Sequence, residues 1–460
     1  MSRPRVQGYL PQDRPATPAL LSLGLQHVIT MFPATVLVAI LTGFDVGVTL
    51  FASGLATVLA LVLSRGHIPL YYGSSFAYIV PVTAIVQLYG IPVAQAGIIA
   101  TAFVSILAGL LIRQVGRAAL DRVLPPIITG SMAIVIGIAL AKAALDQATG
   151  ACCLGENVAT QGGSWFAVAL ITLLITVCAS VYLQGRGLLG MLPILIGALG
   201  GYVVALFFGL VDFSNVATAP WLAVPSFSLP DFTHPQVLTA ILAIAPIAIA
   251  TIPESTAHLY QISLYVDKLA ADLGREPLNI KRLIGLNLML DGLGDFVNGL
   301  LGGCAGTNYG ENNSLMAITR NYSAPVLITA GVIAMLLGFV GKLAAIVSTI
   351  PTAVVGGLAI YLFGVIGLQG VALMQSERVN LFDPRQLAIG ATVLVIGIGG
   401  SAFANGSIPV GGYNLPAIAT AAVFGIVLNL IFALVPAPVV PGATTEPADD
   451  ASTTARQYPA

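Results

Sequence analysis

The chain has 460 residues, of which 57% are hydrophobic and only 8% are charged, and its formal net charge is −1. A mean hydropathy of +0.94 excludes a soluble globular protein. Hydrophobic stretches recur from one end to the other, and at about 20 residues each is long enough to cross the ~30 Å hydrocarbon core of a bilayer. The composition therefore predicts an all-α polytopic membrane protein.

In chain order, we predict about fourteen transmembrane spans, some of them short or broken. The spans cover residues 19–41, 46–64, 70–87, 92–112, 124–144, 165–184, 188–211, 236–259, 283–300, 305–319, 323–341, 344–368, 386–404 and 414–436. The first span follows a polar segment without a small-residue cleavage site, so we expect it to remain in the mature protein.

The basic residues are distributed unevenly between the two membrane faces that these spans define. If both termini are cytoplasmic, all 18 Lys and Arg residues except Lys142 and Lys342 fall on the cytoplasmic side. One missed span would invert everything after it, so this asymmetry supports an even number of spans. We expect a multi-pass protein of the cell (inner) membrane with both termini in the cytoplasm.

Two proline-containing segments indicate that the chain is built twice. Residues 124–134 can be laid on residues 350–360 with Pro125 opposite Pro351 and with matching Gly, Ala and Ile residues. The segments lie half a chain apart, which leaves about seven spans in each half. An odd number of spans gives the two copies opposite orientations, which is the inverted-repeat plan of many secondary transporters.

One span in each half is interrupted by glycine and aromatic residues. These interruptions lie at 71–78 in the third span and at 308–312 in the tenth. Extended backbone at membrane depth is tolerated only where other groups satisfy its amides, so we expect two short antiparallel strands that pair with each other. The half-helices that follow, at about 79–87 and 312–319, would direct their positive N-terminal ends toward the bilayer midplane.

The second interruption belongs to a polar run, residues 305–314, which contains Glu311. Polar groups are expensive inside a membrane, so the run predicts a binding site there. At the start of a half-helix, the carboxylate of Glu311 is stabilised by the helix N-terminus and can accept a ligand N–H. Its alternative role is a simple helix cap.

Glu254 and His258 stand four residues apart in span eight and share one helix face. We expect a hydrogen-bonded pair that handles protons, with the alternative that His258 only anchors the cytoplasmic end of the helix. In span one, His27 of the Gln26-His27 pair either contacts the ligand or hydrogen-bonds behind it.

Asp291 and Asp295 in span nine either line a cytoplasmic path or pair locally, and we expect no direct binding by them. Gly292-Leu293-Gly294-Asp295 spells the Gly-x-Gly-Asp string of intramembrane aspartyl proteases. This enzyme alternative is weak, because such proteases need a partner aspartate that usually follows Tyr, and Asp267 here follows Val266.

No nucleotide-binding loop or metal-ligand cluster is evident in the sequence. We therefore expect a secondary transporter rather than an enzyme, with no cofactor and no metal. Coupling to H⁺ is favoured over Na⁺, because no additional cage of oxygen ligands is evident.

Taken together, these residues resemble the nucleobase/ascorbate transporter family, and specifically its bacterial uracil permease branch, from about Gly24 to about Pro436. The motifs that carry the resemblance are Gln26-His27, Gly73-Ser74-Ser75-Phe76, Glu254 with His258, and the run from Glu311 to Arg320. Two residues depart from the family pattern, since Ser314 and Pro33 stand where relatives have glycine.

The resemblance implies a core domain, a gate domain and a homodimer formed through the gate. The expected segments are 1–17 (cytoplasmic N-terminal segment), 18–115 and 236–343 (core), 116–212 and 344–436 (gate), 213–235 (external connection) and 437–460 (disordered cytoplasmic tail).

The resemblance also implies how uracil binds. Glu254 and Glu311 would accept its N–H groups, the backbone amides of Phe76 and Gly310 would meet its carbonyls, and Phe76 and Tyr309 would bound the ring. Ser75 would belong to the same site. Residues expected to support binding or proton coupling are His258, His27, Gln26, Asn312 and Thr319.

The expected function is proton-coupled uracil import by an elevator-type movement of core against gate. Its partners would be the nucleobase and the lipid bilayer, with no nucleic acid. A purine carrier for xanthine or urate is the alternative within the family, disfavoured because such carriers usually have Gln where this chain has Glu311. A sulfate or bicarbonate carrier of the same fold is more distant, because two carboxylates repel an anion.

Overall fold

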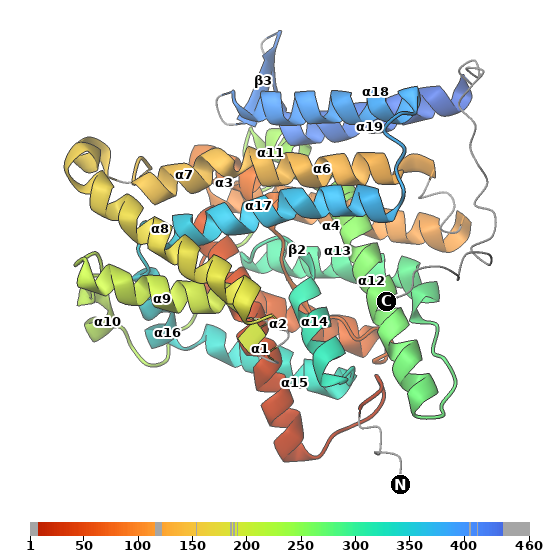
Figure 1. The fold of residues 1–460 in the computed structure, drawn as a ribbon, viewed down its shortest axis with the longest axis horizontal. Coiled ribbons are helices and arrows are strands. Elements are labelled where there is room, and N and C mark those ends of the chain that lie inside the picture. Colours follow the sequence, from red (N-terminus) through yellow and green to blue (C-terminus); the bar gives the residue numbers. More distant parts are fainter. Residues whose placement is uncertain are drawn as a thin grey trace, which may run out of the picture.

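The computed structural model describes residues 8–115, 122–152, 154–184, 186, 189–190, 192–403, 406–411 and 413–435. The tail predicted at 437–460 lies outside these residues. The described part is mostly helical, and most helices run side by side along one direction (Figure 1). Eight of its helices are long and apolar enough to cross a membrane.

The first half of the chain forms α1 (Thr17–Thr42), α2 (Val46–Leu63), α3 (Ile79–Tyr89), α4 (Ile91–Val115), α6 (Pro126–Ala139), α7 (Ala141–Thr149), α8 (Val158–Tyr182), α9 (Pro193–Phe207) and α10 (Ser214–Thr218). The second half forms α11 (Val237–Ile244), α12 (Ala248–Asp272), α13 (Ile284–Leu301), α14 (Gly310–Thr319), α15 (Ala324–Gly338), α16 (Gly341–Ser348), α17 (Thr352–Ser376), α18 (Pro384–Leu394) and α19 (Ala417–Leu434). The shorter helical segments used below are η1 (Phe76–Tyr78) and η5 (Ile280–Leu283).

Several predicted span boundaries are wrong, since α8 begins at Val158 rather than 165 and α9 covers only Pro193–Phe207 of the predicted 188–211. Two further differences have a clear consequence. The span predicted at 344–368 is instead two helices, α16 and α17, and Pro351 stands between them at the N-cap of α17. Proline has no backbone N–H to continue a helix, so the break falls there. Helix α12 runs to Asp272, well past the predicted end at 259, so the first half of the predicted cytoplasmic loop is helical.

Strands β1 (Tyr72–Ser74) and β2 (Gly306–Asn308) pair antiparallel, with Gly73 opposite Thr307. They confirm the prediction of two short antiparallel strands in the interrupted spans. Each strand leads into a short helix, β1 into η1 and α3, and β2 into α14. The site therefore combines two strands with two helix N-termini.

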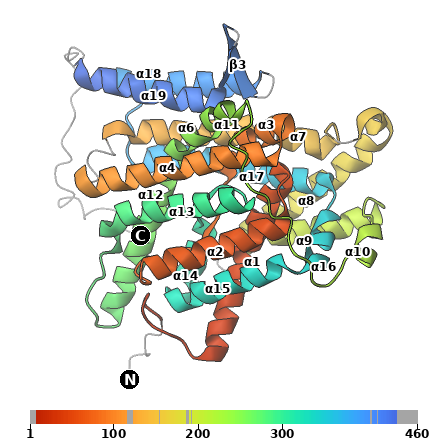
Figure 2. The same ribbon diagram turned by 180° about the vertical axis from the view of Figure 1, so that it is seen from behind.

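A second antiparallel hairpin, β3 (Ser407–Val410) with β4 (Tyr413–Pro416), is absent from the predicted elements. Its turn includes Gly411, which has a φ of 55°, a left-handed conformation that glycine adopts without strain. The hairpin extends from the side of the molecule formed by α18 and α19 (Figures 1 and 2).

Glycine contacts hold helices of the first half against helices of the second. A Cβ atom on Gly54 of α2 would lie 2.4 Å from the carbonyl oxygen of Gly331 of α15, and one on Gly109 of α4 would lie 2.5 Å from that of Gly285 of α13. Helices in a membrane associate through such close backbone approach, since no hydrophobic effect drives them together. The strands are positioned by these helix pairs.

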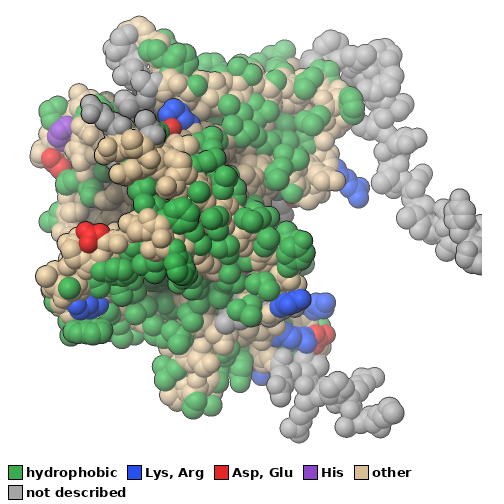
Figure 3. Space-filling view, turned by 60° about the vertical axis from the view of Figure 1, so that its left-hand side comes forward, with side chains coloured by type: hydrophobic (Ala, Val, Ile, Leu, Met, Phe, Trp, Pro, Cys, Tyr) green, Lys and Arg blue, Asp and Glu red, His purple; other side chains and the backbone are tan. Residues whose placement is uncertain are grey.

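The outer surface has the character expected of a membrane protein. Figure 3 shows hydrophobic side chains across the middle of one side of the molecule, with Lys, Arg, Asp and Glu side chains near its left and right edges. Inside, one buried cluster joins residues on both sides of the predicted core and gate boundary, including Tyr78, Ile128 and Phe363.

We predict that Gly54→Ala lowers the free energy of unfolding by about 1–3 kcal/mol, because the added methyl forces α2 away from α15. Gly163→Ala in α8 is the matched control, since nothing lies within 4 Å of a Cβ at that position. It is expected to leave stability unchanged or raise it by about 0.5–1 kcal/mol through helix propensity. Thermal unfolding in detergent measures both, and a Gly54→Ala protein as stable as the wild type would contradict the close-packing argument.

Candidate binding site at the paired strands

The two strands can lie inside the membrane because side chains form hydrogen bonds with the backbone groups on their outer edges. On β1, Thr57 Oγ1 accepts from the N–H of Tyr72 at 3.0 Å, and Ser53 Oγ donates to the Tyr72 carbonyl at 2.6 Å. On β2, Asp295 accepts from the N–H of Gly306 at 2.8 Å. Extended backbone inside a membrane is stable only when such partners exist.

Each strand requires a glycine, Gly73 in β1 and Gly306 in β2, because neighbouring atoms leave no room for a side chain. A Cβ on Gly306 would lie 2.0 Å from the carbonyl oxygen of Gly73, and one on Gly73 would lie 2.2 Å from the ring of Tyr309. The Tyr309 ring stacks on Tyr71 at a centroid distance of 6.3 Å, and its hydroxyl shares a 2.8 Å hydrogen bond with Thr35. Tyr309 is only 4% exposed. The ring of Tyr309 therefore packs against β1. It is not open to stack on a ligand in this structure.

A buried hydrogen-bond network fixes Asn308 at the end of β2. Its Nδ2 donates to Ser255 Oγ at 2.9 Å and to Asp291 Oδ1 at 3.3 Å. Ser255 also donates to Asp291 and accepts from Asn287 Nδ2 at 2.6 Å. Sequence reasoning did not identify Asn308 or Ser255, although Asn308 lies in the polar run and Ser255 follows Glu254.

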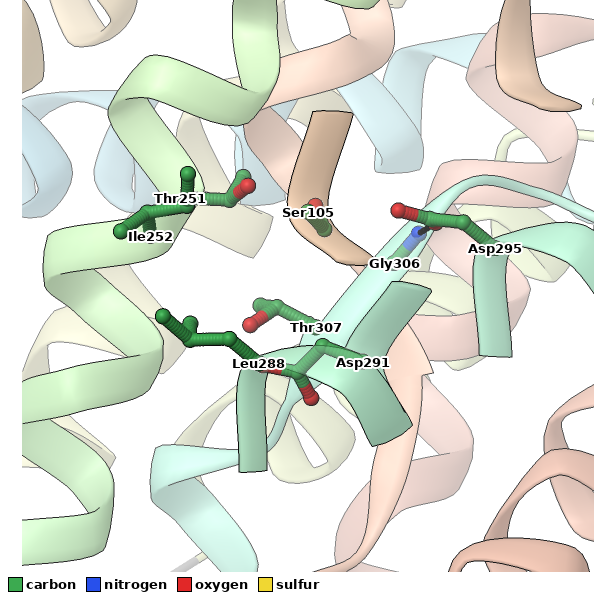
Figure 4. A pocket seen from close by; sticks show the side chains of 8 residues that line it. All are labelled: Ser105, Thr251, Ile252, Leu288, Asp291, Asp295, Gly306 and Thr307. Atoms are coloured by element: carbon green, nitrogen blue, oxygen red, sulfur yellow. Dashed lines mark hydrogen bonds between the residues drawn. The ribbon is translucent and has the colours of Figure 1, made fainter. Parts of the chain in front are cut away.

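The aspartates of α13 pair locally, which was one of the alternatives left open by the sequence. Asp291 belongs to the Asn308 network, and Asp295 accepts from the Tyr72 hydroxyl at 2.7 Å as well as from β2. Together with Ser105, Thr251, Ile252, Leu288, Gly306 and Thr307, they line a small polar cavity behind β2 (Figure 4). The Thr307 hydroxyl is buried and has no hydrogen-bond partner among the described residues. These aspartates are thus structural supports of the strands.

The expected hydrogen bond between Glu254 and His258 is absent from the described residues, and that part of the prediction is wrong. His258 Nδ1 instead lies 2.9 Å from both the backbone oxygen and Oδ1 of Asn308. Both atoms are acceptors, so we assign the proton to Nδ1 and leave Nε2 as an acceptor. A Cβ on Gly310 would lie 2.8 Å from Nε2, so the imidazole borders the start of α14.

Two carboxylates, Glu254 of α12 and Glu311 of α14, are near enough for their charges to interact. The side chain of Glu254 has exposed surface in the structure. Glu311 is half-buried in the first turn of α14, and its charge acts on both Glu254 and His258. Across the described residues, neither carboxylate has a hydrogen bond or an ion pair. Both are available to a ligand.

Backbone donors stand beside these carboxylates. The first N–H groups of a helix have no intrahelical partner, and α14 begins at Gly310 while η1 begins at Phe76. Phe76 is half-buried, whereas Ser75 is buried, donates its N–H to the Ala305 carbonyl at 3.0 Å and accepts from the Ala77 N–H at 3.3 Å. Ser75 therefore shapes the turn after β1.

The remaining predicted residues lie behind or away from the carboxylates. Asn312 Nδ2 donates to His27 Nδ1 at 3.1 Å, and His27 is buried, so His27 supports α14 from behind. Gln26 is half-buried, with no side-chain hydrogen bond to the described residues. Thr319 donates to the Leu315 carbonyl within its own helix at 2.8 Å. The structure does not bring Gln26 or Thr319 to the strands.

Ser314, which replaces the family glycine, is exposed on α14. Its hydroxyl donates to the Gly310 carbonyl at 3.1 Å, one turn earlier in the helix. The serine side chain therefore fits without displacing any neighbour.

We predict that Thr57→Val destabilises the protein by about 1–3 kcal/mol, because valine keeps the shape of threonine but leaves the buried N–H of Tyr72 without its acceptor. Thr57→Ser keeps the hydroxyl and is the control. Thermal unfolding of the two variants compares them directly. Equal stability of Thr57→Val and Thr57→Ser would show that the edge of β1 does not depend on this hydroxyl.

Comparison with known proteins adds independent findings. The sequence model of the Permease family matches residues 18–406. The uracil permease of Bacillus caldolyticus is 38% identical over 91% of this chain and 93% of that protein, and the uracil permease of Bacillus subtilis (strain 168) is 36% identical over 91% and 94%. The transmembrane domain of a cyanobacterium bicarbonate transporter BicA aligns with a TM-score of 0.58 and 19% identity over 90% of this chain and 97% of that one. This last likeness shows a shared fold.

Proposed function

This chain belongs to the nucleobase/ascorbate transporter family, and from that premise we propose that it imports uracil by proton symport. Its relatives are permeases, so the chain is a multi-pass membrane transporter and not an enzyme. The uracil assignment rests on the uracil permeases that the chain matches over nearly their whole length.

The observation that carries the proposal is the pair Glu254 and Glu311, two carboxylates that make no hydrogen bond or ion pair in the part of the chain that the structure describes. Uracil presents ring N–H groups, which Glu254 and Glu311 accept, and carbonyl oxygens, which receive the backbone N–H groups of Phe76 and Gly310. The exposed part of Phe76 covers one face of the ring. Tyr309 acts indirectly in this arrangement, by holding β1 in place.

Glu254 is the proposed coupling site. Two carboxylates close together in a membrane repel each other, and a proton taken up by Glu254 removes that repulsion. Protonation of Glu254 and binding of uracil then favour each other, because both take place at the same two carboxylates. His258 is hydrogen-bonded to Asn308 and borders Gly310, so it lies next to the proposed coupling site. Coupling to Na⁺ is the alternative.

We further propose fourteen spans in two inverted repeats, with core and gate domains at the boundaries given above. The helix contacts support this division, because α2 packs on α15 and α4 on α13 within the core, while α6 and α8 pack on α17 within the gate. Transport would proceed by elevator-type movement of the core along the gate. A homodimer through the gate and cytoplasmic placement of both termini complete the proposal.

A purine carrier is the second candidate within the family. Glu311 argues against it, because a carboxylate accepts a ring N–H but cannot donate, whereas the glutamine usual in xanthine and urate carriers does both. An anion carrier is disfavoured by the unpaired charges of Glu254 and Glu311.

We predict that Glu311→Gln weakens uracil binding about ten- to hundred-fold, because a charged acceptor for the ring N–H is lost. Equilibrium binding of radiolabelled uracil to the purified protein measures the effect, with xanthine as competitor. Ser314→Gly, one turn away on the same helix, is the control and keeps wild-type affinity. Intact uracil affinity in Glu311→Gln would remove the direct contact from the proposal.

For Glu254, we predict that the change to Ala abolishes uracil accumulation driven by a proton gradient in proteoliposomes. The uptake assay is run with a proton gradient and with a sodium gradient imposed separately. Accumulation by wild-type protein under the sodium gradient alone would contradict proton coupling. Unchanged accumulation by the Glu254→Ala variant would move the coupling site elsewhere.

A further inference from the structure

Away from the strands, a second cavity of about 520 Å³ lies where α4, α12, η5 and α13 meet. It is lined by Ile112, Arg113, Tyr260, Lys281, Arg282, Leu283, Ile284, Gly285 and Leu286. Its volume is within the ~300–1,000 Å³ typical of ligand sites. The proposed orientation of the chain puts this cavity at the cytoplasmic surface of the membrane.

Three cations line this cavity without a counter-charge. Within the described residues, Arg113, Lys281 and Arg282 make no ion pair and no side-chain hydrogen bond. The nearby acids of α12 are engaged elsewhere, since Asp267 accepts from the N–H groups of the loop before η5 and Asp272 pairs with Arg320. Among the described residues, the positive charge of the cavity is therefore not compensated.

The N-terminus of α13 adds to this positive field. Helix α13 has no side-chain cap at Leu283 and no acidic residue in its first turn. A Cβ on Gly285 would lie 3.1 Å from Arg113 Cβ, so the close crossing of α4 and α13 brings Arg113 against that first turn. Unpaired helix N–H groups beside a cation bind phosphate-like anions.

An apolar strip leads away from the cavity along α4. Phe103, Leu107, Leu110 and Leu111 are 60%, 58%, 42% and 51% exposed, and their spacing places them on one face of the helix. Leu110 lies one turn before Arg113. A ligand that combines an anionic head with long apolar tails fits both parts, whereas a soluble phosphate would use only the cavity.

We propose that this cavity binds the headgroup of an anionic phospholipid, with the acyl chains along α4. The phosphate meets Arg113, Lys281, Arg282 and the N-terminus of α13. Basic pockets between transmembrane helices at the cytoplasmic surface recognise such headgroups. Because the site lies at a contact of α4, α12 and α13, the bound lipid ties these helices of the core together.

The test uses the delipidated full-length protein in detergent, and its thermal stability is measured with added phosphatidylglycerol, phosphatidylcholine or inorganic phosphate. Phosphatidylglycerol alone is expected to raise the melting temperature. A triple variant, Arg113→Gln with Lys281→Gln and Arg282→Gln, is expected to need about ten-fold or more phosphatidylglycerol for the same rise. The control, Arg186→Gln with Lys268→Gln and Arg378→Gln, removes the same charge from the same face and responds as the wild type.

An equal rise with phosphatidylcholine, or an unchanged response in the triple variant, would overturn the site. A rise with inorganic phosphate at comparable concentration would make the ligand a soluble phosphate and overturn the lipid assignment. Native mass spectrometry of the single Arg113→Gln variant is the second measurement, in case the triple variant is poorly folded. It is expected to retain fewer phosphatidylglycerol molecules than the wild type, and equal retention counts against the proposal.

Discussion

The whole arrangement depends on the need to satisfy backbone hydrogen bonds where water is absent. Strands β1 and β2 supply each other along one edge, and the hydroxyls of Ser53 and Thr57 and the carboxylate of Asp295 supply the outer edges. Without these partners, extended backbone would not persist at membrane depth. The two carboxylates of the proposed site stand where this framework ends and the helices begin.

The polar groups of the region fall into two sets with opposite states. Asp291, Asp295 and Nδ1 of His258 have hydrogen-bond partners in the protein, and these bonds tie α12 and α13 to the strands. Glu254 and Glu311 lack protein hydrogen bonds throughout the described residues. A rigid framework beside unfilled acceptors is what a recognition site requires, since the cost of ordering the protein is met before the ligand arrives.

Much of this arrangement can be predicted from the sequence, because polar residues are costly inside a membrane and therefore stand out. The run 305–314 and the Gly73 segment stand out against an apolar background, and they predict the strand pair that the structure contains. Contacts between distant segments are not readable in this way. Spacing puts Glu254 and His258 on one face of α12, but the preference of His258 for Asn308 arises only when β2 packs beside it. The covered ring of Tyr309 likewise depends on Tyr71 and Thr35, neighbours that spacing does not reveal, whereas the break at Pro351 has a local cause.

The glycine contacts also join helices that are synthesised at different times. Helix α2 packs on α15, and α4, which lies between them in the chain, packs on α13. In each pair, the first helix is made long before its partner. Synthesis delivers the N-terminal half first. Strand β1 is therefore synthesised long before β2. Ser53 and Thr57 can satisfy its outer edge at once, but the edge that pairs with β2 needs water or other polar groups until residues 306–308 are made. The strand pair can therefore close only after every helix from α3 to α13 has been made.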